Sequence, residues 1–185
     1  MELNNILKAI KKGITIADVI KAVNLTKKVG INHKVNFIIG HPMESYNDAL
    51  DSIRLAEKLE CSFVGFNNLI PYPGSEAYRL ISTNPKAKFI SSPETYLNQL
   101  THKKTMPVFE TNNFPKEEID KALGQGFELE ERTLARFRFG RIKGYIAYLV
   151  SRHQHIFKPA IWLFQRIIST RLGSAGYNMV VKPPW

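Results

Sequence analysis

Residues 61–78 read CSFVGFNNLIPYPGSEAY and join a short apolar strand to a rigid turn. The run CSFVGF has the length and composition of a buried strand. Pro-Tyr-Pro-Gly at 71–74 then closes the strand, because proline fixes φ and glycine permits close turns. The residues after Ser75 are typical of a helix. The stretch therefore predicts a strand, a tight turn and a helix in succession.

The preceding sixty residues show the same alternation of helix and strand. Helices are predicted over 4–13, over 15–30 with a capping box of Thr15 and Asp18, and after a cap at Ser45. Between them, KVNFIIG at 34–40 has the composition of a strand that is buried on both faces. Because the connections are short and helical, the two strands are expected to be parallel. The fold class predicted is α/β.

The second half of the chain is less regular. Residues 82–116 contain four prolines and predict an irregular connection with one helix near Glu94 to Leu100. From Pro115 a helix resumes and is expected to break or bend near Gly124 and Gly126. The predicted organisation is an α/β unit over 1–81, a connection over 82–114 and a basic helical extension over 115–185.

The positive charge is confined to the end of the chain. Of 26 Lys and Arg residues, 16 precede residue 132 and are matched by all 16 acidic residues, whereas residues 132–185 contain 10 basic residues and no acid. Such a block suggests a polyanionic surface or an acidic partner. Nucleic acid is the least favoured of these, because no recognised reading motif accompanies the charge.

The cysteine content and the hydropathy indicate a cytoplasmic protein. Cys61 is the only cysteine, so it can form neither an intramolecular disulfide nor a cysteine metal cluster, and its apolar context predicts a buried, unreactive thiol. The longest charge-free part of the apolar tail, residues 144–151, is far shorter than a bilayer span, and the first residues do not resemble a signal peptide.

Two loops could carry chemistry, since binding sites in parallel βα folds form after the carboxyl ends of the strands. They are GHPMES at 40–45 and IPYPGSE at 70–76. On local sequence alone, both are better explained as tight turns. His41 and Glu44 could contact a ligand, although a loop histidine of no special role and a carboxylate at a helix start explain them as well. His153 and His155 lie two residues apart, on different faces of a helix, and so are not expected to share a metal.

Taken together and in order, KKGITIADVIKAVNLTKKVGI, VNFIIGHPMES and VGFNNLIPYPGSEAY resemble the second half of a radical S-adenosylmethionine (radical SAM) barrel. The resemblance is closest to the cobalamin-associated and methylthiotransferase-like branches and covers about residues 4–80. It implies a partial (βα) barrel. It also implies that Ile38 and Gly40 of the first strand lie against the adenine of S-adenosylmethionine, together with Asn68, Pro71 and Tyr72 at the end of the second. Asn36 stands where the family has a further glycine.

The chain lacks the CxxxCxxC loop that would ligate the family's 4Fe-4S cluster. The resemblance therefore implies the carboxyl-terminal part of a radical SAM enzyme, inactive alone and with no catalytic or metal-ligating residue of its own. It leaves open whether cobalamin is a further cofactor. A chain with the other half of the barrel would be its partner.

The alternative is a non-enzymatic basic module that binds a partner protein or an anionic membrane surface through the amphipathic tail. Packing of the tail helices against the rest of the protein is the simpler explanation of the same pattern, and it is favoured.

Overall fold

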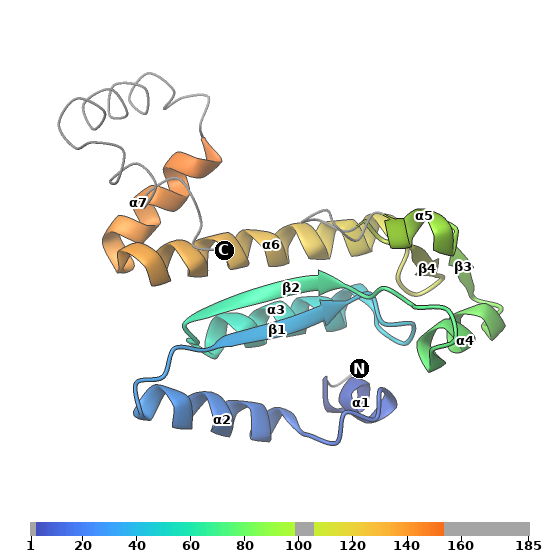
Figure 1. The fold of residues 1–185 in the computed structure, drawn as a ribbon, viewed down its shortest axis with the longest axis horizontal. Helices are drawn as coiled ribbons and strands as arrows, with labels where there is room; N and C mark the ends of the chain where they lie inside the picture. Colours follow the sequence, from blue (N-terminus) through green and yellow to red (C-terminus); the bar gives the residue numbers. More distant parts are fainter. Residues whose placement is uncertain (1–2, 99–105, 154–185) are drawn as a thin grey trace.

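The computed structural model describes residues 3–98 and 106–153 (Figure 1). Its α-helices and strands follow the predicted alternation in the first half of the chain. In chain order they are α1 (Leu3–Ala9), α2 (Ile16–Lys28), β1 (Lys34–Ile39), α3 (Tyr46–Lys58), β2 (Phe63–Asn68), α4 (Glu76–Thr83), β3 (Ala87–Phe89), α5 (Pro93–Asn98), β4 (Phe109–Thr111), α6 (Lys116–Phe139) and α7 (Arg141–Arg152).

The central sheet consists of β1 and β2, which are parallel as expected. Lys34 pairs with Phe63 and Ile39 pairs with Asn68, and α3 connects the two strands. Capping boxes begin both α2, at Thr15 and Asp18, and α3, at Ser45 and Asp48. The mixed α/β class is thus confirmed. A partial barrel is not shown, because β1 and β2 form a two-stranded sheet in the described part of the chain.

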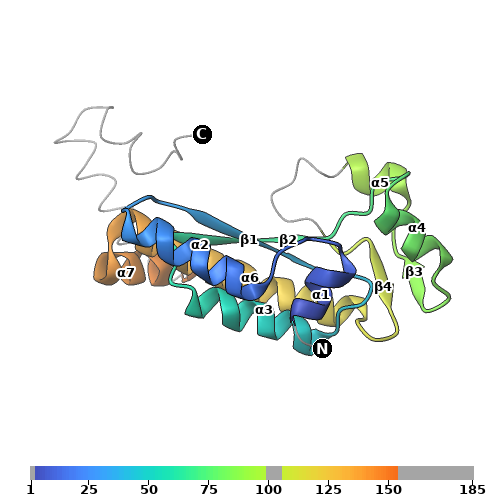
Figure 2. The same ribbon diagram turned by 90° about the horizontal axis from the view of Figure 1, so that it is seen from below.

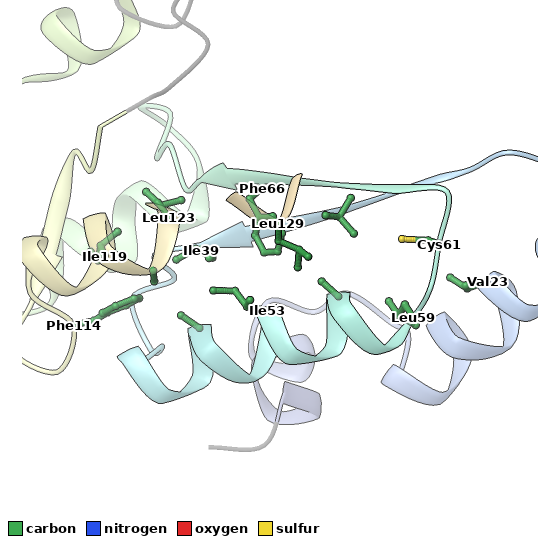
Figure 3. Close-up of a cluster of buried hydrophobic side chains, with 14 residues drawn as sticks. Val23, Ile39, Ile53, Leu59, Cys61, Phe66, Phe114, Ile119, Leu123 and Leu129 are labelled. Atoms are coloured by element: carbon green, nitrogen blue, oxygen red, sulfur yellow. The ribbon is translucent and has the colours of Figure 1, made fainter. Parts of the chain in front are cut away.

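The main hydrophobic core lies between one face of this sheet and helices α3 and α6. Ile39 and Phe66 project from the strands towards Ile53 of α3 and Leu129 of α6 (Figure 3). Val64 belongs to the same cluster. The Phe37 and Phe66 rings stack with their centroids 5.2 Å apart. Cys61 is 2% exposed within this core, which confirms the prediction of a buried thiol.

Helix α6 is unbroken across both glycines at which a bend was predicted, so that prediction was wrong. A Cβ on Gly126 would lie 2.7 Å from Cγ of Phe66, whereas a Cβ on Gly124 would meet no atom within 4 Å. Gly126 therefore allows α6 to approach β2 closely, and the resulting burial outweighs the weak helix propensity of glycine. The helix ends instead at Gly140, whose φ is 78°.

Beyond Gly140, α7 turns back against the end of α6 (Figure 1). A Cβ on Gly144 would lie 2.6 Å from the Ala135 carbonyl oxygen, so only glycine allows the two helices this close. The Tyr148 hydroxyl donates a hydrogen bond of 2.7 Å to Glu128 and joins the two helices further along. The described part of the predicted helical extension, α6 and α7, thus forms a helical hairpin.

A second, smaller core lies at the carboxyl end of the sheet, where the sequence predicted an irregular connection. Strands β3 and β4 pair antiparallel there, with Phe89 opposite Phe109. Ile81, Tyr96 and Val108 are buried beside them. The strands were missed because each has only three residues and no sustained alternation of apolar and polar side chains.

Within the described residues, no helix is long and apolar enough to cross a membrane.

Candidate functional site

The carboxyl ends of β1 and β2 lie side by side and lead into the two loops singled out by the sequence (Figure 1). The Leu69 amide donates a hydrogen bond of 2.9 Å to the Ile39 carbonyl and extends the pairing by one residue. Gly40 follows β1 with a φ of 94°, a value that favours glycine. A Cβ at Gly40 would lie 3.0 Å from Oδ1 of Asn68. The fold therefore brings two of the five predicted site residues, Gly40 and Asn68, into direct proximity.

The loop after β1 is closed by the carboxylate of Glu44. Its Oε2 accepts hydrogen bonds from the backbone amides of Gly40, at 2.7 Å, and His41, at 3.0 Å. Glu44 is 2% exposed, and its burial raises its pKa to about 7 even though the two amides favour the charged form. Glu44 thus shapes the loop that carries Gly40, and the following Ser45 caps α3.

His41 also lies in this loop and is partly buried. Its Nδ1 atom is buried and has no hydrogen-bond partner among the described residues. Desolvation lowers the pKa of the imidazole, so His41 is neutral at pH 7. The loop therefore offers an uncharged ring nitrogen beside a buried carboxyl group.

The loop after β2 is anchored to the second core. The Asn68 side chain donates a hydrogen bond of 2.9 Å to the Met106 carbonyl, and the Tyr96 hydroxyl donates one to the Pro71 carbonyl. Pro71 is buried, so its side chain supports the loop from behind. Tyr72, in contrast, is 52% exposed and available to a ligand.

Among the described residues, no helix covers one face of the β1–β2 sheet, and β1 alternates between exposed and partly buried residues, which corrects the expectation that this strand is buried on both faces. Figure 2 shows α3 and α6 together on one side of the strands. On the other face, Ile38 is 59% exposed and pairs in register with the exposed Asn67. Lys34 and Asn36 are exposed on the same face of β1. We call these four residues, with Gly65, the open face. The alternation of Lys34, Val35, Asn36 and Phe37 was a usable signal of a half-buried strand.

Ile38 is thus the predicted site residue that lies on the open face, and the sequence interpretation missed its neighbour Asn67 and, at the amino end of the same strand, Lys34. Lys34 lies across Gly65, since a Cβ on Gly65 would collide with its Cε and Nζ atoms. The open face therefore presents an apolar side chain and an amide, Ile38 and Asn67, beside the carboxyl-end loops, and Asn36 and Lys34 further towards the amino end of the strands.

Comparison with known proteins gives one informative relative and no matching family model. The chain is 30% identical over 122 residues to an uncharacterized methyltransferase from Pyrococcus horikoshii. The match includes 66% of this chain and 25% of the relative, so the chain spans about a quarter of the relative's length.

These findings correct the resemblance to radical SAM enzymes and the function that it implied. The relative is named a methyltransferase, and no radical SAM family model matches the chain. Within residues 3–98 and 106–153, no group of three or more His, Cys, Asp or Glu side chains could hold a metal ion. The iron-sulfur and cobalamin assignments are accordingly unsupported, and the relative does not favour the non-enzymatic alternative. The assignment of Ile38, Gly40, Asn68, Pro71 and Tyr72 to a cofactor site stays a prediction.

Proposed function

We propose that the chain is part of a methyltransferase and that its open face and carboxyl-end loops form one wall of the S-adenosylmethionine site. The observation that carries the proposal is the placement of Gly40 beside Asn68 at the ends of two parallel strands, in a chain similar to a methyltransferase. Ligands of parallel α/β folds bind in this position. S-adenosylmethionine, when bound, supplies an electrophilic methyl group.

The exposed side chains fit the chemistry of this cofactor. Ile38 offers an apolar surface to the adenine ring, and the amide of Asn67 can donate to or accept from the ring nitrogens. The Tyr72 ring, held between two prolines, offers a second aromatic surface. Gly40 and Asn68 are buried and pack against each other, so they position the two strand ends that present Ile38 and Tyr72 to the ligand.

Calorimetric titration of the 185-residue chain with S-adenosylmethionine and S-adenosylhomocysteine tests the proposal. We expect saturable binding, with Ile38→Asp weakening it at least about tenfold because a carboxylate would be desolvated against the ligand. Tyr72→Ala is expected to weaken it by about three- to tenfold.

Ile146→Asp is the matched control, since Ile146 is 55% exposed on α7, far from the site (Figure 1). Absence of binding by the unmodified chain up to about 1 mM ligand would reject the site, because cofactor affinities seldom lie above that range. Equal affinity of Ile38→Asp and the unmodified chain would also reject it.

A further inference from the structure

A cavity lined by three arginines lies at the opposite end of the sheet from the proposed cofactor site. It has a volume of about 310 Å³ and is enclosed by α3, α6 and α7. Arg132 and Arg136 enter it from α6, and Arg141 and Tyr145 enter it from α7. Cys61, just before the amino end of β2, lies in its wall. A second hollow of about 380 Å³ shares Cys61, Arg136 and Arg141 and adds Lys27.

The positive charge of the cavity is only partly neutralised. Arg132 pairs with Glu57 at 2.6 Å, and Lys27 pairs with Glu60 at 3.1 Å. Arg136 donates a hydrogen bond to the Cys61 carbonyl, but neither it nor Arg141 has a carboxylate within ion-pair distance among the described residues. The segment from 132 onwards contains no acidic side chain that could supply one. Glu60, which already pairs with Lys27, is also attracted electrostatically to Arg136 and Arg141. Among the described residues, one carboxylate therefore opposes three cations at this place, and positive charge is left for an anion.

Two further features of the cavity favour a bound anion. Burial raises the pKa of the Cys61 thiol, so this part of the wall is neutral at pH 7 and does not repel an anion. Helix α7 begins at Gly140 with no side-chain cap, and Gly140 lines the adjoining hollow together with Arg141, so the uncapped start of the helix is near the arginines.

We propose that this cavity binds a phosphate group, carried by a small molecule or by a lipid headgroup, through Arg132, Arg136 and Arg141. Guanidinium groups bind phosphate through paired hydrogen bonds. A phosphate of charge about −2 matches the excess of positive charge that Lys27, Arg136 and Arg141 have over Glu60. The volume is sufficient for a phosphate and a small polar substituent. Ile142 and Ile146 are exposed on the adjoining surface of α7, so a lipid is one source of the phosphate.

Titration with pyrophosphate at constant ionic strength, followed by calorimetry, tests the cavity directly. We expect saturable binding that falls at least about tenfold in the double variant Arg136→Gln/Arg141→Gln. The control double variant Lys12→Gln/Lys143→Gln removes the same charge from exposed positions outside the cavity and should remain within about twofold of the unmodified chain. If the Arg136 substitution impairs folding, Arg141→Gln alone carries the test, because Arg141 is exposed.

Flotation with phosphatidylcholine vesicles, with and without phosphatidylglycerol, identifies the source of the phosphate. If the chain binds the anionic vesicles through its arginines but does not bind pyrophosphate, the phosphate belongs to a lipid headgroup. If it binds pyrophosphate but not the vesicles, the phosphate belongs to a soluble molecule. The proposal is overturned if neither probe binds, or if the control variant loses as much affinity as the arginine variant. Binding of S-adenosylmethionine at the other end of the sheet is expected to be unchanged in the arginine variants.

Discussion

At the scale of single residues, buried polar side chains and glycines determine the local structure. Their roles could be predicted only in part from the sequence. Ser45 was identified as a helix cap from its position alone, and Cys61 as a buried thiol from its apolar neighbours. Glu44 was not understood, because its role depends on two backbone amides that turn back towards it only in the folded loop. Gly126 was misread as a break, since its partner Phe66 is sixty residues away in the sequence.

Glu44 predicts an unusual pH dependence of stability. In the folded chain its pKa is about 7, above the ordinary value of 4.5 that applies when unfolded. Between these values the folded state holds a proton that the unfolded state has released, so the free energy of unfolding falls as the pH rises through this window. Ionisation of Glu44 is expected to lower the free energy of unfolding by about 3 kcal/mol across this pH range.

Urea unfolding from pH 4 to pH 8 measures this effect. Glu44→Gln is expected to flatten the dependence, since the amide cannot ionise, whereas Glu94→Gln on the exposed side of α5 should leave the profile unchanged. If the free energy of unfolding has the same pH dependence in the Glu44 variant and in the unmodified chain, the raised pKa of Glu44 is contradicted.

The two glycines of α6 give a second prediction at this scale. Gly126→Ala is expected to destabilise the fold by about 1–3 kcal/mol, because the new methyl group would collide with Phe66. Gly124→Ala in the same helix meets no atom and should be neutral or stabilise by up to about 1 kcal/mol through its higher helix propensity. Thermal unfolding of both variants distinguishes the positions, and equal effects would argue against close packing of α6 on β2.

At the scale of helices and strands, prediction from the sequence was most accurate where the apolar periodicity and the capping residues indicated the same element. The β1 strand, the β2 strand and helices α2 and α3 were predicted within a few residues of their observed ends, because each has an apolar pattern bounded by glycine, proline or a capping side chain. The pairing of β3 with β4 could not be predicted, since it depends on burial of Phe89 and Phe109 beside Tyr96 and not on local pattern.

The cap of α3 is expected to contribute to the stability of the whole core. The Ser45 hydroxyl accepts from the Asp48 amide, and α3 supplies Ile53 and Ala56 to the main cluster. Ser45→Ala should lower the free energy of unfolding by about 1 kcal/mol. Ser82→Ala, which removes only an exposed hydroxyl bonded to the Tyr78 carbonyl, is the control and should have an effect within about 0.5 kcal/mol.

At the scale of the whole molecule, the described chain has two separate ends with different chemistry. The carboxyl ends of the strands lead into the two loops of the proposed cofactor site, whereas the amino ends meet the arginines of α6 and α7 (Figure 1). The sequence predicted the first end from the general position of sites in parallel folds. It predicted the basic charge at the second, but the cavity was not predictable, because it requires the turn at Gly140 that folds α7 back.

Cys61 provides a probe of this whole arrangement. Because the thiol is buried and its pKa is raised, labelling by a thiol reagent at pH 7 should be at least about a hundredfold slower than in the urea-unfolded chain. Gly126→Ala, which loosens the contact of α6 with β2, is expected to accelerate labelling. Rapid labelling of the unmodified chain would show that α3 and α6 do not close over the sheet.

The hydrogen bonds from Asn68 to Met106 and from Tyr96 to Pro71 have a mechanical consequence. Each joins the end of β2, which belongs to the main core, to elements of the smaller one. The loop that carries Tyr72 is therefore held between the main hydrophobic core and the smaller one. Loss of either hydrogen bond is expected to free Tyr72 to move relative to the open face, so the shape of the proposed pocket depends on the packing of the smaller core.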